Sequence, residues 1–423
     1  MSTEPRSRRL GRPLLILAGL ALAGSTAFLT WWTTTLTGLP DVGDPFDVAA
    51  FSRPIPDETN AFVLYREAVT RLPKEPEVAV TDWKVAGPEH RGWLQRSREA
   101  LALWRKGTER PDALYVDPSR STFEIQLNVP QSMRGLGRAA MLEGTRLEEQ
   151  GDLEGALSWY CAGIRASRHL GRRGFLIERL IGIMMHHMAV DRLNRWAADP
   201  RVDARLLRRA LNAAIETGEM TPPNSDSLKA EYLSLMHSMA DPDLMVRLLD
   251  YEIVPDGKGG GTTVYGQHRW KSGLFRVGRR AMNEPERSRR VARMIFANLL
   301  AYCDLPPSRR PPKVSSKITG TAPDLRALGD LYVVDTSAPE AARALPPEKL
   351  ASWFATTIDA GQFLPAFAAV EKAIARERST QASLLVNLAN ELCKRERGAY
   401  PERIEDLVGP YLKELPTGYA LTK

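Results

Sequence analysis

The stretch GDLEGALSWYCAGIRASRHLGRRGFLIERLIGIMMHHMAVDRLNRWAA, residues 151–198, carries the most regular pattern in this 423-residue chain. Apolar residues recur in it every three or four positions, as on one face of an α-helix. With residues 133–150 it predicts three helices, separated by Gly151-Asp152 and by residues 171–174. The same periodicity dominates from Asp57 onward, and strand-like alternation is almost absent. We therefore expect a mostly α protein.

Capping and helix-breaking residues predict further helices on both sides of this stretch. Asp57-Glu58-Thr59-Asn60 precedes a helix that Pro73 ends, and Pro88 opens one that is expected to stop at Gly107. Later in the chain we expect a basic helix at 285–302, a short strand at 331–334 and a long helix at 363–394. The linear organisation is a cytoplasmic basic flank and transmembrane anchor at 1–35, an α-helical, repeat-like domain at 36–253, a loop-rich basic insertion at 254–346 and a C-terminal helical segment at 347–423.

The apolar run LLILAGLALAGSTAFLTWW, residues 14–32, is long enough to span a bilayer, since about 1.5 Å per residue gives about 29 Å. Four arginines precede it and the next one is Arg53, which predicts an inside amino terminus and an extracytoplasmic body. A cleaved signal peptide, cut near Ser25 and Ala27, is the alternative interpretation. The uncleaved single-pass anchor is favoured because apolar residues continue past that cut.

Three resemblances accompany these patterns. EQGDLEGALSWYCAGIRA, within 134–168, resembles the turn and second helix of a tetratricopeptide repeat, and the pattern does not recur. LANELCKRERGAYPERIEDLVGPYLKELP, at 388–416, resembles the tail motif of type II secretion pseudopilins, although the prepilin cleavage pattern is absent. Taken together, this tail, PIPDETNAFVLYREA and DLEGALSWYCAGIRASRHLGRRGFLIERLIGIMMHHMAVDRL are similar to an uncharacterised group of planctomycete-type membrane-anchored helical proteins. The resemblance implies a helical-hairpin or solenoid-like soluble body behind an anchor, and no particular reaction.

Basic residues are concentrated in two places, the flank of the apolar run and residues 268–317, whereas the remaining chain is net acidic. This distribution argues against a general nucleic-acid binder. The second concentration interleaves cations with Trp270 and Phe275 and is a candidate surface for anionic lipid or anionic wall polymer. The alternative is that these cations pair with the acidic remainder of the same protein. The candidate residues are Arg269, Lys271, Arg276, Arg279, Arg280, Arg287, Arg289, Arg290 and Arg293.

Three histidines near methionines form the most suggestive metal-ligand set: His186, His187 and His237. Imidazole and thioether suit copper. Adjacent helical positions point about 100 degrees apart, so His186 and His187 cannot both ligate one ion unless another helix contributes. We therefore favour ordinary packing for them and expect no metal and no cofactor. The three cysteines are scattered and odd in number, which favours buried free thiols.

The sequence contains no catalytic constellation, because it lacks a GxSxG elbow and an SxxK motif, and DGKGGGTT at 256–263 has the wrong order for a phosphate loop. The favoured function is a membrane-anchored extracytoplasmic binding or scaffold module with the membrane as its partner, and the sequence does not identify the ligand. One alternative is a cell-envelope hydrolase or metal-dependent enzyme whose site is assembled from distant residues. Another is an accessory of secretion or pilus machinery. A protein partner is compatible with each of these functions.

Overall fold

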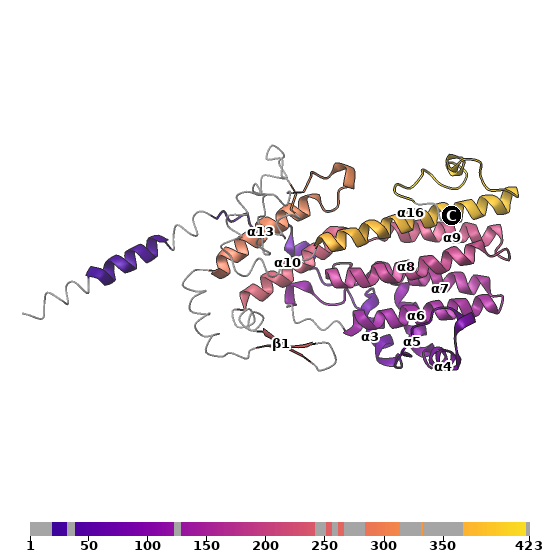
Figure 1. The fold of residues 1–423 in the computed structure, drawn as a ribbon, viewed down its shortest axis with the longest axis horizontal. Coiled ribbons are helices and arrows are strands. Elements are labelled where there is room, and N and C mark those ends of the chain that lie inside the picture. The colour runs from indigo at the N-terminus through magenta and orange to yellow at the C-terminus, as the bar shows by residue number, and fades with distance from the viewer. Residues whose placement is uncertain are drawn as a thin grey trace, which may run out of the picture. The chain divides into compact units, whose positions relative to one another are not determined.

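The computed structural model describes residues 19–31, 39–121, 128–241, 251–255, 261–265, 284–313, 331–332 and 367–419. Within these ranges the chain is mostly helical, as the sequence predicts. Figure 1 shows the helices and strands in chain order. The α-helices are α2 (Val48–Phe51), α3 (Ala61–Arg71), α4 (Pro88–Arg96), α5 (Arg98–Thr108), α6 (Asn128–Glu149), α7 (Leu153–His169), α8 (Leu176–Ala198), α9 (Ala204–Glu219), α10 (Asn224–Ala240), α13 (Glu284–Tyr302) and α16 (Phe367–Arg397).

Several helices begin where a short polar side chain caps a free backbone N–H group. Asn60 Oδ1 accepts from Phe62 N at 3.1 Å at the start of α3. Asp152 does the same for Gly155 N at 2.8 Å in α7, and Asp203 for Leu206 N at 2.7 Å in α9. Each cap satisfies a donor that has no partner within its helix. The predicted helix starts near Asn60 and Asp152 are therefore confirmed.

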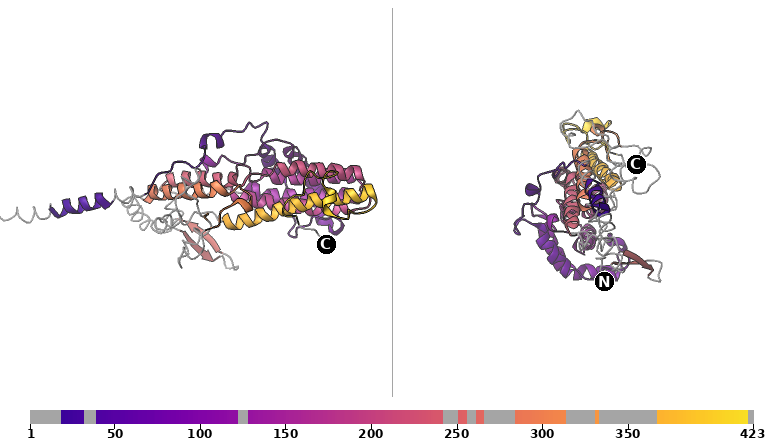
Figure 2. Two further views of the ribbon diagram at one scale, coloured as in Figure 1. Left: turned by 90° about the horizontal axis from the view of Figure 1, so that it is seen from above. Right: turned by 90° about the vertical axis from the view of Figure 1, so that its left-hand side faces the viewer.

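The chain divides into two compact units, each discontinuous in sequence. One unit comprises Met1–Pro45, Ser238–Asn298 and Pro311–Phe363, and the other comprises Phe46–His237, Leu299–Arg310 and Leu364–Lys423. We call the second unit the helical unit. In it, α6, α7 and α8 pack against one another in chain order, and α16 packs against both α8 and α9. Figures 1 and 2 show these helices side by side, with the yellow α16 returning along α8 and α9.

The turn between α6 and α7 brings two helices into very close contact. A Cβ built on Gly144 would lie 2.4 Å from Tyr160 Cε1, so only a glycine allows the ring to approach the α6 backbone. Tyr160 is fully buried there, and its hydroxyl donates to Glu148 Oε1 at 2.5 Å. The three helices expected between residues 133 and 198 are thus present as α6, α7 and α8.

The helix predicted from Pro88 to Gly107 differs from the structure at two points. It is divided at Ser97 into α4 and α5, and the buried Ser97 hydroxyl donates to Trp93 O at 2.9 Å. Such a bond to the carbonyl four residues earlier competes with the helical ladder and bends helices. Gly107 does not end α5, because the helix continues through Thr108. This glycine allows close approach instead, since its Cβ would lie 2.5 Å from Tyr65 Cε1.

Part of the predicted loop-rich insertion is a β-hairpin. Strands β1 (Tyr251–Pro255) and β2 (Gly261–Tyr265) pair antiparallel, with Tyr251 opposite Tyr265. Residues 261–265 of the predicted loop-rich insertion are therefore a strand, because pairing with β1 extends a segment that shows little alternation by itself. Of the strand expected at 331–334, the described part is an isolated bridge between Tyr332 and Lys313.

The amino-terminal apolar run is described only over residues 19–31, which are helical. Leu20 and Leu22 are 65% and 72% exposed on that helix. Across the described ranges, no helix has both the length and the apolar character needed to cross a bilayer. Residues 14–18 and Trp32 of the predicted span lie outside those ranges.

Candidate functional site

The three histidines proposed as metal ligands have different surroundings. His186 on α8 is fully buried, His187 is half-buried beside it with ring centroids 6.0 Å apart, and His237 on α10 is exposed. No three histidine, cysteine, aspartate or glutamate side chains within the described ranges lie close enough to share a metal ion. Among the described residues, His186, His187 and His237 thus do not belong to such a group. Cys161, Cys303 and Cys393 are buried free thiols.

The described arginines of the basic segment have partners within the protein. On α13, Arg289 and Arg290 both contact Glu286, at 2.7 and 2.9 Å. Arg293 contacts Asp41 and Asp44 at 2.9 and 3.3 Å, and Arg287 is buried. These contacts match the alternative in which the cations pair with acidic residues of the same chain. The remaining candidates, Arg269, Lys271, Arg276, Arg279 and Arg280, lie outside the described residues.

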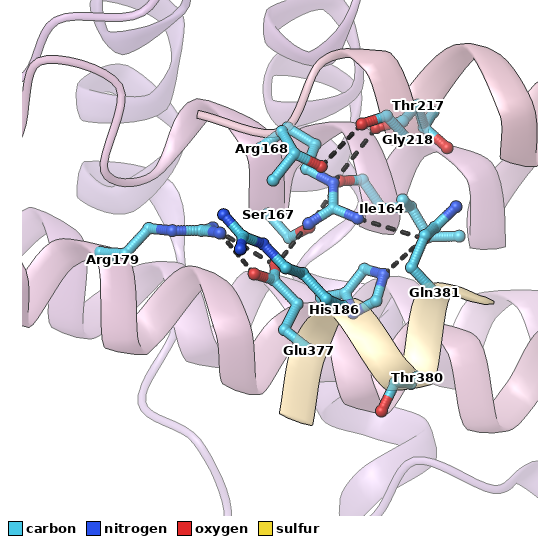
Figure 3. Close-up of polar contacts among 12 residues, drawn as sticks. Ile164, Ser167, Arg168, Arg179, His186, Thr217, Gly218, Glu377, Thr380 and Gln381 are labelled. Carbon is cyan, nitrogen blue, oxygen red and sulfur yellow. Dashed lines mark hydrogen bonds and ion pairs between the residues drawn. The ribbon is translucent and has the colours of Figure 1, made fainter. Parts of the chain in front are cut away.

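The most unusual polar feature of the helical unit is a carboxylate enclosed by two arginines. Glu377 on α16 accepts hydrogen bonds from Arg168 on α7 and from Arg179 on α8. All three side chains are about 1–2% exposed. Figure 3 shows both guanidinium groups converging on the carboxylate. Buried charges are tolerated only when they are paired and hydrogen-bonded, so this cluster fixes the relative positions of three helices.

Gln381, one turn further along α16, extends this network to a histidine. Its Nε2 donates to Ala214 O at 2.8 Å, and because a carbonyl only accepts, the amide oxygen must face the other way. That oxygen lies 3.1 Å from Arg168 Nη2 and 2.8 Å from His186 Nε2. His186 therefore carries its proton on Nε2. Burial, followed by the charge of Arg168, lowers the pKa of His186 well below its usual value, so the ring is neutral.

A cavity of about 430 Å³ adjoins this network. Its volume lies within the range typical of small-ligand sites. The apolar part of its wall comes from Pro222 and Pro223, which precede α10. The complete lining is Arg168, Gly218, Thr221, Pro222, Pro223, Asp304, Glu377, Arg378 and Gln381.

Two exposed charged residues in the lining differ in their local bonding. Asp304 Oδ1 accepts from Asn224 N at 2.6 Å and from Ser225 N at 3.1 Å, so it caps the start of α10. Arg378 on α16 makes one long hydrogen bond, 3.4 Å from Nη2 to Asn224 Oδ1. Loss of solvent around its guanidinium, followed by the nearby charge of Arg310, lowers the pKa of Arg378. Arg378 nevertheless remains a cation at neutral pH.

Sequence reasoning missed this site, although a signal for it is present. Along α16, Val370, Ile374, Glu377, Gln381 and Leu384 are all buried and follow the three-and-four spacing of a core-facing stripe. Two polar residues therefore occupy positions at which the helix expects apolar ones. Such positions indicate a buried polar network, but the helical pattern does not identify the partners.

The comparisons with known proteins found no match among family models, curated proteins or solved structures. The chain is thus characterised by its own fold, a mostly helical protein with a buried ion cluster beside a cavity. The resemblances to planctomycete-type anchored proteins, to a tetratricopeptide hairpin and to a pseudopilin tail stay predictions.

Proposed function

We propose that this protein is a membrane-tethered binding module of the bacterial cell envelope, and that it holds a small ligand in the cavity beside Arg168. The observation that carries the proposal is the arrangement of the cavity wall. Charged groups from α7 and α16 are fixed there by mutual hydrogen bonds before any ligand arrives. Such preorganisation lowers the cost of ordering side chains on binding.

Binding is favoured over catalysis because the groups suited to proton transfer are already engaged. Both oxygens of Glu377 accept from arginines, and His186 Nε2 is engaged by Gln381. A general base needs hydrogen-bonding access to the proton that it removes. Glu377 would have to break structural contacts to gain that access. The Nδ1 atom of His186 makes no hydrogen bond to the described residues, but it is fully buried and does not line the cavity. A ligand, in contrast, can use the cavity wall as it stands.

The membrane tether is supported by the first residues of the chain. The apolar run at 14–32 follows four arginines, and exposed Leu20 and Leu22 belong to it. Apolar side chains gathered on one exposed segment are typical of contact with lipid or with another protein. We propose that the arginines remain in the cytoplasm and that the helical body lies outside it.

Membrane extraction tests the tether. Full-length protein is expected to remain in the pellet after an alkaline carbonate wash, and a carboxy-terminal tag is expected to be accessible to protease only from outside the cytoplasm. Release of a soluble product that begins near Phe28 would instead identify a cleaved signal peptide. This result would remove the tether without affecting the binding proposal.

Thermal unfolding of the detergent-solubilised full chain tests the cavity. The probes are succinate and inorganic phosphate as anions, spermidine as a cation, glycine as a zwitterion and glucose as a neutral solute. At least one probe is expected to raise the unfolding temperature progressively with its concentration. The corresponding gain in the free energy of unfolding is about 2.7 kcal/mol at a hundred times its Kd. If no probe does so, the proposed binding function at this cavity is wrong.

A matched pair of threonine variants locates the binding. Thr221 lines the cavity, and its hydroxyl donates to Gly218 O at 2.7 Å. Thr70 makes the same kind of bond, to Glu67 O at 2.7 Å, away from the cavity. Thr221→Phe is expected to fill the space and abolish stabilisation by the probe, whereas Thr70→Phe should retain it. Equal behaviour of the two variants would place binding elsewhere.

A further inference from the structure

The cavity lining contains two guanidinium groups, of Arg168 and Arg378, and two carboxylates, of Glu377 and Asp304, and Arg179 adds a third guanidinium that binds Glu377 from outside the lining. Glu377 is shared by two of the arginines. Asp304 is bonded to backbone N–H groups at the start of α10, where the helix dipole already favours a negative charge. One cation is therefore left without a carboxylate of its own.

Arg378 is that cation. Among the described residues, no carboxylate lies within ion-pair distance of it, and its hydrogen bond to Asn224 is long. Its neighbour Arg310 is bound differently, because it pairs with Glu371 at 2.9 Å and donates to Leu305 O and Cys303 O, both at 2.8 Å. Arg310 is thus satisfied within the fold, whereas the Arg378 guanidinium retains donors for a ligand.

Arg168 and Gln381 also retain donors beside the cavity. A guanidinium has five N–H groups, and three of those on Arg168 have acceptors, namely Thr217 O, Glu377 and Gln381. An amide nitrogen has two N–H groups, and one of those on Gln381 goes to Ala214 O. The wall therefore offers several N–H groups, and two of the residues that carry them are already fixed in position.

We infer that the cavity binds a small organic anion. Its oxyanion, a carboxylate or a phosphate, accepts hydrogen bonds from the exposed guanidinium of Arg378, whereas the almost fully buried Arg168 is held behind it by its own protein partners. Its apolar part lies against Pro222 and Pro223. The inference rests on the proposed binding function and adds the class of ligand. Guanidinium groups suit it because their planar donors match the paired oxygens of carboxylate and phosphate.

Calorimetric titration of the full chain in detergent tests the inference, with succinate and inorganic phosphate as separate probes. Arg378→Gln is expected to weaken binding of the preferred anion about tenfold or more, as for loss of a hydrogen bond to a charged group. Arg376→Gln is the matched control, because Arg376 is an exposed cation on the same helix that does not line the cavity. The affinity of Arg376→Gln for the anion should stay within about twofold of that of the parent chain, because the charge of the exposed Arg376 is screened by solvent.

Each result of this titration decides the inference. A loss confined to Arg378→Gln supports it, and the stronger of the two probes shows whether carboxylate or phosphate is preferred. Equal losses in both variants, or no loss in either, would overturn it. If spermidine or glycine binds while the anions do not, the anion inference fails but the binding module stands. If no probe of any class binds, both proposals fail. Unfolding without a probe checks that each variant is folded.

Discussion

Arg179 on α8 donates to Glu377 on α16 across a sequence separation of 198 residues, at 3.3 Å from Nη1 to Oε1 and through a second bond from Nη2. This ion pair is almost completely buried, and Arg168 joins it from α7. It connects the first and the last of the three sequence segments that form the helical unit. It also holds a wall of the cavity in place, so stability and the proposed binding are coupled at Glu377.

Removing the carboxylate should therefore destabilise the helical unit. Glu377→Gln leaves two buried guanidinium groups without their counter-charge, and we expect a loss of about 3–5 kcal/mol in the free energy of unfolding. Denaturant unfolding of the full chain measures it. The control is Glu402→Gln, which changes an exposed glutamate and should alter stability by less than about 0.5 kcal/mol. Similar values for the two variants would mean that the buried cluster contributes nothing.

The contact between α6 and α7 should be sensitive to the addition of one methyl group at Gly144. In Gly144→Ala the new Cβ would lie 2.4 Å from the Tyr160 ring, so ring and backbone must separate, at a cost of about 1–3 kcal/mol. Gly87→Ala is the control, because a Cβ there meets no atom within 4 Å. Thermal unfolding should show a clear decrease for Gly144→Ala alone. A Gly144→Ala protein as stable as its parent would contradict the close packing.

Stability should depend on pH through Glu178, which is 1% exposed and accepts from Phe175 N at 3.2 Å. Burial raises the pKa of Glu178 from 4.5 to about 7. The folded state therefore holds this proton more tightly than the unfolded state, and stability from this group decreases as the pH rises from 4.5 to 7. The decrease is at most about 1.4 kcal/mol per pH unit.

Glu178→Gln removes this titration and keeps an oxygen for the Phe175 N–H group. Relative to the parent chain, the variant should gain stability as the pH rises through that window and keep a constant advantage above it. Urea unfolding from pH 4.5 to pH 8 measures the difference. Glu77→Gln, at an exposed position, should give a curve parallel to that of the parent. If Glu178→Gln is also parallel, the carboxyl group does not titrate as we expect.

Asn60 should stabilise the fold at two places, the start of α3 and the backbone at Leu114. Its Oδ1 accepts from Phe62 N at 3.1 Å and from Leu114 N at 3.0 Å, and its Nδ2 donates to Leu114 O at 3.0 Å. Asn60→Ala loses all three bonds, and we expect a decrease of about 1–3 kcal/mol in unfolding free energy. Asp47→Ala removes a cap from the short α2 only and should cost less. A reversed order of the two variants in chemical unfolding would refute this assignment.

Much of the helical fold could be predicted because its signals are local. Asn60 and Asp152 mark helix starts, and the stripe that includes Ile374 and Leu384 places one face of α16 in the core. Ser97 shows where such reasoning fails, since its hydroxyl bond to Trp93 O divides a helix without breaking the apolar pattern. The prediction that a helix ends at Gly107 fails for another reason, because the role of this glycine depends on Tyr65, which belongs to a different helix.

By itself, the sequence determined the helical class, several helix boundaries and the expectation of a membrane tether, because capping, periodicity and hydropathy act between residues close together in the chain. Only the tertiary structure brought Arg168, Arg179 and Glu377 together beside a cavity. A buried charge is stable only beside an opposite charge. The order of residues along the chain does not show which distant side chain supplies that opposite charge. Packing of α16 against α8 and α9 makes that choice, and it places Arg378 at the cavity with no carboxylate of the described residues within ion-pair distance.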